Sequence, residues 1–162
     1  MIRLLLLFIF LESPSLFAQQ LAPSYWRPIV GKTCKTETDF PQLKGYSFST
    51  GTVISDAADP EQKQVHVYKK GFTAVVFFII RQDDSRLFVV DAVEIRNLNT
   101  DQEISIGTCQ DGAAAMPGIV ALVKKTSGRW RALKAWHFDL DRLTVKFWPA
   151  NQVTCLPEEG ED

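Results

Sequence analysis

The sequence predicts an all-β protein, a single-domain antiparallel sandwich or open barrel of about seven or eight strands. Short apolar or alternating runs recur along the chain, and polar turn residues separate them. Only residues 129–135 (RWRALKA) contain enough good helix formers to suggest a helix. A short helix there would make the fold α+β instead.

The best-defined predicted element is a hairpin over residues 72–95. Its two arms, residues 72–81 (FTAVVFFIIR) and 86–95 (RLFVVDAVEI), are each of strand length. The break between them, QDDS, contains Asp and Ser side chains that bond nearby backbone groups in turns. The glycine of Lys70-Gly71 suits a tight turn into the first arm. We therefore expect this hairpin to supply much of the core.

A second hairpin is predicted over residues 136–148, half buried and half exposed. Trp136, Phe138 and Leu140 alternate with polar residues, and the same alternation returns after the turn. The buried face of the returning arm should carry Leu143, Val145 and Phe147. Further strands are expected within residues 45–55, 65–69, 104–109 and 118–125.

Both ends of the chain differ in composition from the rest. Residues 1–18 show a short basic start, an unbroken apolar run over residues 4–11 and small residues near Ala18. That order is typical of a secretory signal peptide, and the run is much shorter than the roughly 20 residues of a spanning helix. Residues 19–157 form the predicted β-rich domain, and residues 158–162 an acidic, disordered tail. We expect an exported, soluble protein, periplasmic or secreted.

Three cysteines and a nearly balanced charge limit the possible functions. The formal net charge is −1, so nucleic acid is an unfavoured partner. In an oxidising compartment a disulfide is expected, and Cys109–Cys155 would tie the C-terminal end to the sheet. Pairs that involve Cys34 remain the alternative. The cysteines are too widely spaced for a zinc site, and no cofactor motif is present.

Catalytic and metal-binding patterns are weak. A nucleophilic role for Cys109 would require His66 or His137 as a base, and only glycines near the thiol suggest it. His137, Asp139 and Asp141 share one face of a predicted strand, but consecutive members lie about 7 Å apart. We therefore predict no metal site, and the sequence favours a non-enzymatic role.

A basic and aromatic cluster is the predicted ligand-binding surface. Arginine and tryptophan often anchor interfaces, and the cluster could meet an anionic ligand outside the cytoplasm. Its alternative is a solvated hairpin end whose charges prevent edge aggregation. The cluster comprises Lys124, Lys125, Arg129, Trp130, Arg131 and Lys134.

The sequence thus favours a small exported binding protein, such as an inhibitor or an envelope accessory factor, whose partner is a protein or an anionic ligand. Two alternatives remain. One is a cysteine-dependent hydrolase that uses Cys109 with a histidine, and the other is a purely structural or assembly protein. No resemblance to a known family guides the choice.

Overall fold

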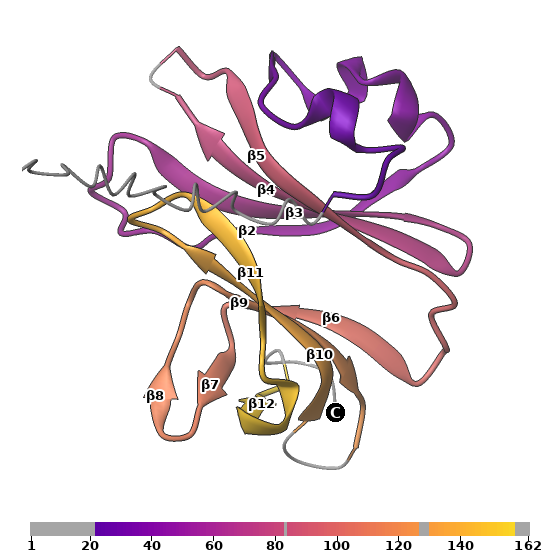
Figure 1. The fold of residues 1–162 in the computed structure, drawn as a ribbon, viewed down its shortest axis with the longest axis vertical. Coiled ribbons are helices and arrows are strands. Elements are labelled where there is room, and N and C mark those ends of the chain that lie inside the picture. Colours follow the sequence, from indigo (N-terminus) through magenta and orange to yellow (C-terminus); the bar gives the residue numbers. More distant parts are fainter. Residues whose placement is uncertain (1–21, 83, 127–129, 158–162) are drawn as a thin grey trace, which may run out of the picture.

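Two antiparallel β-sheets make up most of the computed structural model, which describes residues 22–82, 84–126 and 130–157 (Figure 1). The all-β prediction is confirmed, because the described residues contain strands and only four short 3-10 turns. The turns are η1 (Arg27–Ile29), η2 (Glu37–Asp39), η3 (Pro41–Leu43) and η4 (Ala150–Gln152).

Sheet A has five strands in the order β1-β5-β4-β3-β2, so β1 and β2 are its terminal strands. Its central part is the predicted hairpin, which the structure confirms as β4 and β5. The turn into β4 contains Gly71 at φ 56°, a left-handed conformation that favours glycine. The strands are β1 (Thr33–Cys34), β2 (Ser47–Val53), β3 (Gln62–Lys70), β4 (Thr73–Arg81) and β5 (Leu87–Ile95).

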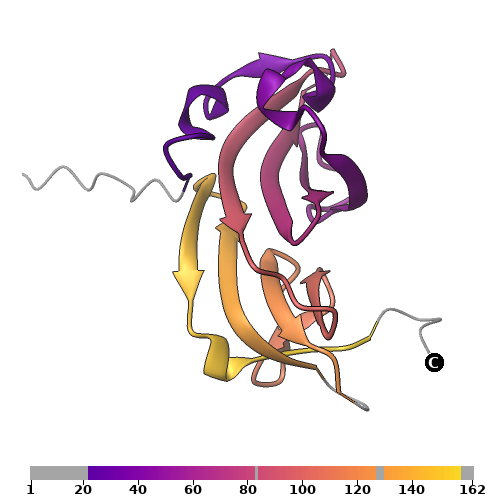
Figure 2. The same ribbon diagram turned by 90° about the vertical axis from the view of Figure 1, so that its right-hand side faces the viewer.

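Sheet B has the order β6-β9-β10-β12-β7-β8, and β11 pairs with the C-terminal half of β10. In Figures 1 and 2 sheet A fills the upper half of the molecule and sheet B the lower half. The strands of sheet B are β6 (Gln102–Ile106), β7 (Cys109–Asp111), β8 (Ala114–Ala115), β9 (Ile119–Lys124), β10 (Trp130–Asp139), β11 (Thr144–Trp148) and β12 (Val153–Cys155).

Three apolar clusters hold these layers together. The first lies between the sheets, where Phe78 of β4 meets Phe138 of β10 edge to face at 5.4 Å between ring centroids. The second lies on the outer face of sheet A, where residues 22–46 cover it and Trp26 is fully buried. The third lies on the outer face of sheet B around the Cys109–Cys155 disulfide. Because β4 has buried side chains on both faces, it reads as a continuous apolar run.

Residues 130–139 form strand β10, so the alternative prediction of a helix over 129–135 is wrong. The strand pairs with β9 along one edge and with β12 and β11 along the other. Trp130 and Ala135 are buried on the outer face, and the register shifts at Leu133. Packing on both sides therefore overrides the helical propensity of this segment.

The second predicted hairpin is confirmed as β10 and β11, but one of its expected core residues is exposed. Val145 is buried in the core between the sheets, whereas the Phe147 side chain is 63% exposed. Phe147 lies opposite Trp136 in the register, and their ring centroids are 6.2 Å apart. Phe147 thus covers the buried indole of Trp136 from outside instead of entering the core.

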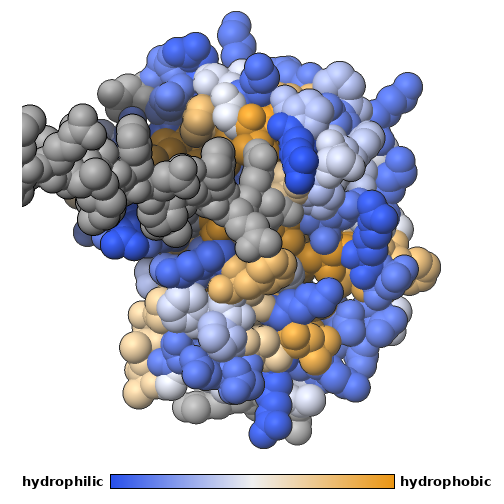
Figure 3. Space-filling view, viewed as in Figure 1, coloured by the Kyte–Doolittle hydropathy of each residue, from blue (hydrophilic) through white to orange (hydrophobic). Residues whose placement is uncertain are grey.

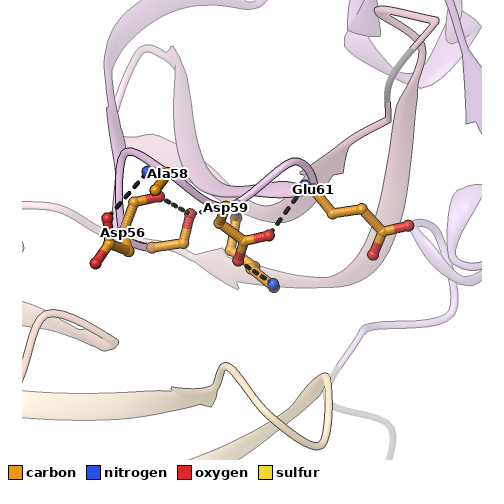
Figure 4. Close-up of polar contacts among 6 residues, drawn as sticks. Asp56, Ala58, Asp59 and Glu61 are labelled. Atoms are coloured by element: carbon orange, nitrogen blue, oxygen red, sulfur yellow. Dashed lines mark hydrogen bonds and ion pairs between the residues drawn. The ribbon is translucent and has the colours of Figure 1, made fainter.

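The loop between β2 and β3 is held by short polar contacts that fix the register of this hairpin (Figure 4). The Asp56 carboxylate accepts a bond from the Ala58 amide at 2.9 Å, and Asp59 accepts one from Glu61 at 3.0 Å. Asp59 also forms an ion pair with Lys63. Such Asp-centred turns replace the backbone bonds that a loop lacks, and here they position the edge strand β2.

The predicted signal peptide over residues 1–18 and the predicted acidic tail over residues 158–162 lie outside the described residues. Of the described helical segments, none is long and apolar enough to cross a membrane. The surface in Figure 3 is mostly hydrophilic, with hydrophobic side chains visible along the middle, where the two sheets meet.

Candidate functional site

A groove lies on the described surface between an edge of sheet A and the adjoining end of sheet B. On the opposite side of the molecule β11 of sheet B contacts β5 of sheet A, which brings the sheets together there. Between β2 and β6, the terminal strands of the two sheets, no hydrogen-bonded pairing joins the described residues. We call this opening the seam. Its groove has a volume of about 630 Å³ and is lined by Thr50, Gly51, Thr52, Ile106, Gly107, Thr108, Cys109, Gln110, Ala115, Leu156 and Pro157.

A smaller recess of about 180 Å³ shares Thr50 with the groove and extends it along β2. Lys69 of β3 and Glu103 of β6 are among the residues that line this recess. The two walls approach each other at Thr52, whose Cγ2 lies 4.0 Å from the position that a Cβ would take on Gly107. The groove therefore runs along β2, with residues of sheet B as its other wall.

The pairing register shows which backbone groups of β2 point into the seam. The Ile54 amide donates to the Lys63 carbonyl at 2.9 Å, which makes this a hydrogen-bonded pair of the ladder. Because hydrogen-bonded and non-hydrogen-bonded pairs alternate in antiparallel sheets, the amide and carbonyl groups of Val53 and Gly51 point away from β3. No described strand pairs with this edge of β2.

The same reasoning applies to β6 on the opposite wall. The Lys125 amide donates to the Asp101 carbonyl at 2.9 Å, so the backbone groups of Ile104 and Ile106 point away from β9. Their side chains are buried, with exposed fractions of 4% and 6%. In β2, by contrast, every residue except Thr50 is exposed. The edge of β2 is therefore the more accessible of the two.

Gly51 leaves room for neighbouring aromatic side chains on the outer face of β2. A Cβ on this residue would lie 2.9 Å from the His66 ring and 3.1 Å from the Phe48 ring, closer than ordinary contact allows. Phe48 packs edge to face on His66, with 5.7 Å between ring centroids, and is itself 56% exposed. The seam edge thus offers hydroxyl side chains on its inner face and an aromatic ring on its outer face.

A largely buried acid–base pair, Glu37 and His66, lies behind this edge. Glu37, from the segment that covers sheet A, forms an ion pair with His66 Nδ1. His66 Nε2 contacts Gln64 Oε1 at 3.0 Å, so an amide fills the position where a hydroxyl or thiol would have to lie. Burial tends to raise the pKa of Glu37, yet hydrogen bonds from His66, its own backbone and Tyr68 outweigh burial and lower it.

Cys109, the nucleophile of the alternative hydrolase hypothesis, lies in a disulfide with Cys155, which confirms the pairing predicted from the sequence. The two cysteines are directly opposite each other in the β7–β12 pair, and their Cα atoms are 4.0 Å apart. The thiol that a Cys109 hydrolase would need is thus consumed in the cross-link. The free cysteine, Cys34, is buried. Desolvation is the main cause that raises its pKa to about 11, and the negative charges of Glu37 and Asp39 raise it further.

Of the three residues of the weak metal pattern, His137 and Asp139 lie in β10, whereas Asp141 lies in the turn that follows it. His137 packs against Trp148 at 4.9 Å between ring centroids, and burial and the charge of Lys146 lower its pKa. Asp139 accepts a bond from the Arg142 amide at 3.0 Å in the turn. Among the described residues no group of three potential ligands is close enough to hold a metal ion.

The predicted basic cluster is only partly available for binding. Lys124 lies 3.2 Å from Asp101, and Lys125 forms an ion pair with Glu103, so acids of β6 and its preceding turn balance both lysines. Trp130 is 5% exposed and supports Lys125, whose Nζ lies 5.4 Å from the centre of its ring. Arg129 lies outside the described residues. Arg131 and Lys134 are the remaining cations of the cluster. Both are exposed, and neither forms an ion pair with another described residue.

The seam residues were not predicted from the sequence. The strand over residues 45–55 was expected, and its small polar residues and Gly51 are compatible with a close backbone approach. However, which strand ends each sheet depends on pairings between distant segments, which no local pattern records. No protein-family model, curated protein or solved structure matches this chain.

Proposed function

We propose that this is an exported, non-enzymatic binding protein that holds its ligand in the seam. The observation that carries the proposal is a groove of about 630 Å³ bordered by a strand edge that no described strand pairs with. Natural proteins usually cover or shorten such edges, because an open edge attracts other chains. An inhibitor or an envelope accessory factor needs a binding surface of this kind and no catalytic group.

Two further observations support the parts of this proposal. The apolar run near the start of the chain and the Cys109–Cys155 disulfide are both compatible with an oxidising compartment. The disulfide also occupies the thiol that the hydrolase hypothesis requires, and Gln64 occupies the free side of His66. The exposed cations Arg131 and Lys134 form a competing surface for an anionic ligand.

Site-specific photo-crosslinking distinguishes the two surfaces. A photoreactive residue replaces Thr52, which lines the groove, or Lys134, which lies in the basic cluster. The proteins are then irradiated in an extracytoplasmic extract of the source cells. We expect a discrete adduct from position 52 and none from position 134. An adduct from position 134 alone would replace the seam with the basic cluster, and substrate turnover on a hydrolase panel would overturn the non-enzymatic assignment.

A further inference from the structure

We propose that the occupant of the seam is an extended polypeptide segment that adds to β2 as an extra strand and carries an acidic group opposite Lys69. This inference rests on the proposed function, because it takes the seam as the binding site. It adds to the proposed function the chemical class of the ligand, a polypeptide, and the sign of the charge that the ligand carries.

The first argument is the spacing of the free backbone groups. Gly51 and Val53 each present an amide and a carbonyl away from β3, Gly51 lines the groove, and alternate residues of a strand repeat about every 7 Å. An extended polypeptide has donors and acceptors with the same repeat, whereas glycans and lipid headgroups do not. Edge pairing of this kind supplies affinity through the main chain and leaves selectivity to the neighbouring side chains.

The second argument is access along the strand. Gly51 has no side chain, and the outer face beside it is filled by Phe48 and His66. Thr50 and Thr52 border the groove with small hydroxyl side chains. At the other end of β2 the register shifts between Phe48 and Thr50, a bulge that disturbs pairing there. The regular part of the edge, from Thr50 to Val53, is thus where an added strand would pair.

The third argument is charge complementarity along β2. Lys69 lies opposite Ser47, lines the recess and belongs to no ion pair within the described part of the chain. Lys70 lies next to it in the sequence and donates to the Lys44 carbonyl at 3.4 Å, so Lys69 and Lys70 place two cations at this end of β3. The acid across the recess, Glu103, is already paired with Lys125. A carboxylate on the incoming strand would balance this excess of positive charge.

The test uses synthetic ten-residue peptides of alternating threonine and valine, labelled with fluorescein and measured by fluorescence anisotropy. One peptide carries glutamate at both ends, a second carries lysine at both ends, and a third is the glutamate peptide with all of its threonine and valine amides N-methylated. N-methylation removes these donors along both edges of the strand but leaves the side chains and the charge unchanged. We expect it to weaken binding by about tenfold, because it removes two or more hydrogen bonds.

Charge variants of the protein test the polarity of the seam. We expect the glutamate peptide to bind wild-type protein more tightly than the lysine peptide, and Lys69→Glu to reverse that order by about two- to fivefold for each peptide. Lys134→Glu is the matched control, because it makes the same change in net charge on an exposed site of β10, and it should bind both peptides like wild type. Thermal melts establish that each variant is folded, and Lys69→Gln replaces Lys69→Glu if the latter is not.

The outcomes separate this inference from the proposed function. Equal binding of the methylated and unmethylated peptides, or an unchanged preference in the Lys69 variants, would overturn strand addition with an acidic partner. A position-52 adduct with a glycan or lipid, together with no peptide binding, would also overturn it while leaving the seam as the binding site. Absence of both an adduct and peptide binding would overturn the two proposals together.

Discussion

Removal of the Cys109–Cys155 disulfide should lower the free energy of unfolding by about 4 kcal/mol. The cross-link closes a segment with a sequence separation of 46 residues, and the chain-entropy relation for a loop of that length gives about 4 kcal/mol at 25 °C. Domains of this size are stable by about 5–15 kcal/mol in total. The loss of this free energy should therefore shift the unfolding midpoint strongly. The local loss of order should be greatest in the short strand β12.

The measurement is urea unfolding at pH 7, monitored by tryptophan fluorescence, with and without a reducing agent. Comparing oxidised and reduced forms of the same chain keeps the side-chain atoms constant, so the difference reports the cross-link and not a cavity. The Cys34→Ala background prevents disulfide exchange, because it removes the free cysteine. A difference below about 1 kcal/mol would refute the reasoning and indicate that the denatured chain stays compact without the cross-link.

Three further predictions concern the residues around the seam and beneath the N-terminal segment. Because the pKa of Glu37 is lowered in the folded protein, its contribution to stability is present above its unfolded pKa and is lost as pH falls through the folded one. Urea midpoints between pH 6 and pH 3 should therefore fall more steeply for wild type than for Glu37→Gln, and equal slopes would contradict this. Cys34, buried and with a pKa raised to about 11, should react with iodoacetamide only at the rate of unfolding. Rapid alkylation under native conditions would contradict this and would show that the segment around Cys34 opens without global unfolding. Gly51→Ala should destabilise the protein by about 1–3 kcal/mol, since the added Cβ would lie 2.9 Å from the His66 ring. Ser47→Ala on the same strand is the control and should unfold like wild type; equal stability of the two variants would show that the His66 ring moves aside freely.

Local patterns predicted the parts of the fold that depend on neighbouring residues. The hairpin of β4 and β5 was predicted correctly because two apolar runs flank a short polar break. The Cys109–Cys155 pairing was also predicted correctly, since Cys109 ends one expected strand and Cys155 lies just past the last expected strand. The helix over residues 129–135 failed as an alternative because β10 has partners on both edges, and pairing with distant strands outweighs weak propensity.

The candidate site could not be predicted in the same way. Lys124 and Lys125 looked like free charges in sequence, but Asp101 and Glu103 come from a neighbouring strand region and balance them. Trp130 looked like an interface anchor, but it fills the third apolar cluster. In each case the decisive partner is remote in the sequence, so composition alone overestimates the exposed positive charge.

The opening of the seam follows from how the chain leaves β6. At Gly107 the backbone takes φ 75°, a conformation that favours glycine, and the chain continues into β7, which pairs with β12. The disulfide then fixes β7 to the C-terminal strand β12, and neither of these strands is a neighbour of β6 in the pairing order of sheet B. As a result β6 receives no second partner, and β2, which faces it, receives none from sheet B. The same cross-link that stabilises the C-terminal end therefore also holds one wall of the groove, because Cys109 and Leu156 both line it. It follows that reduction of the disulfide should weaken peptide binding at the seam even under conditions in which β3, β4 and β5 remain folded.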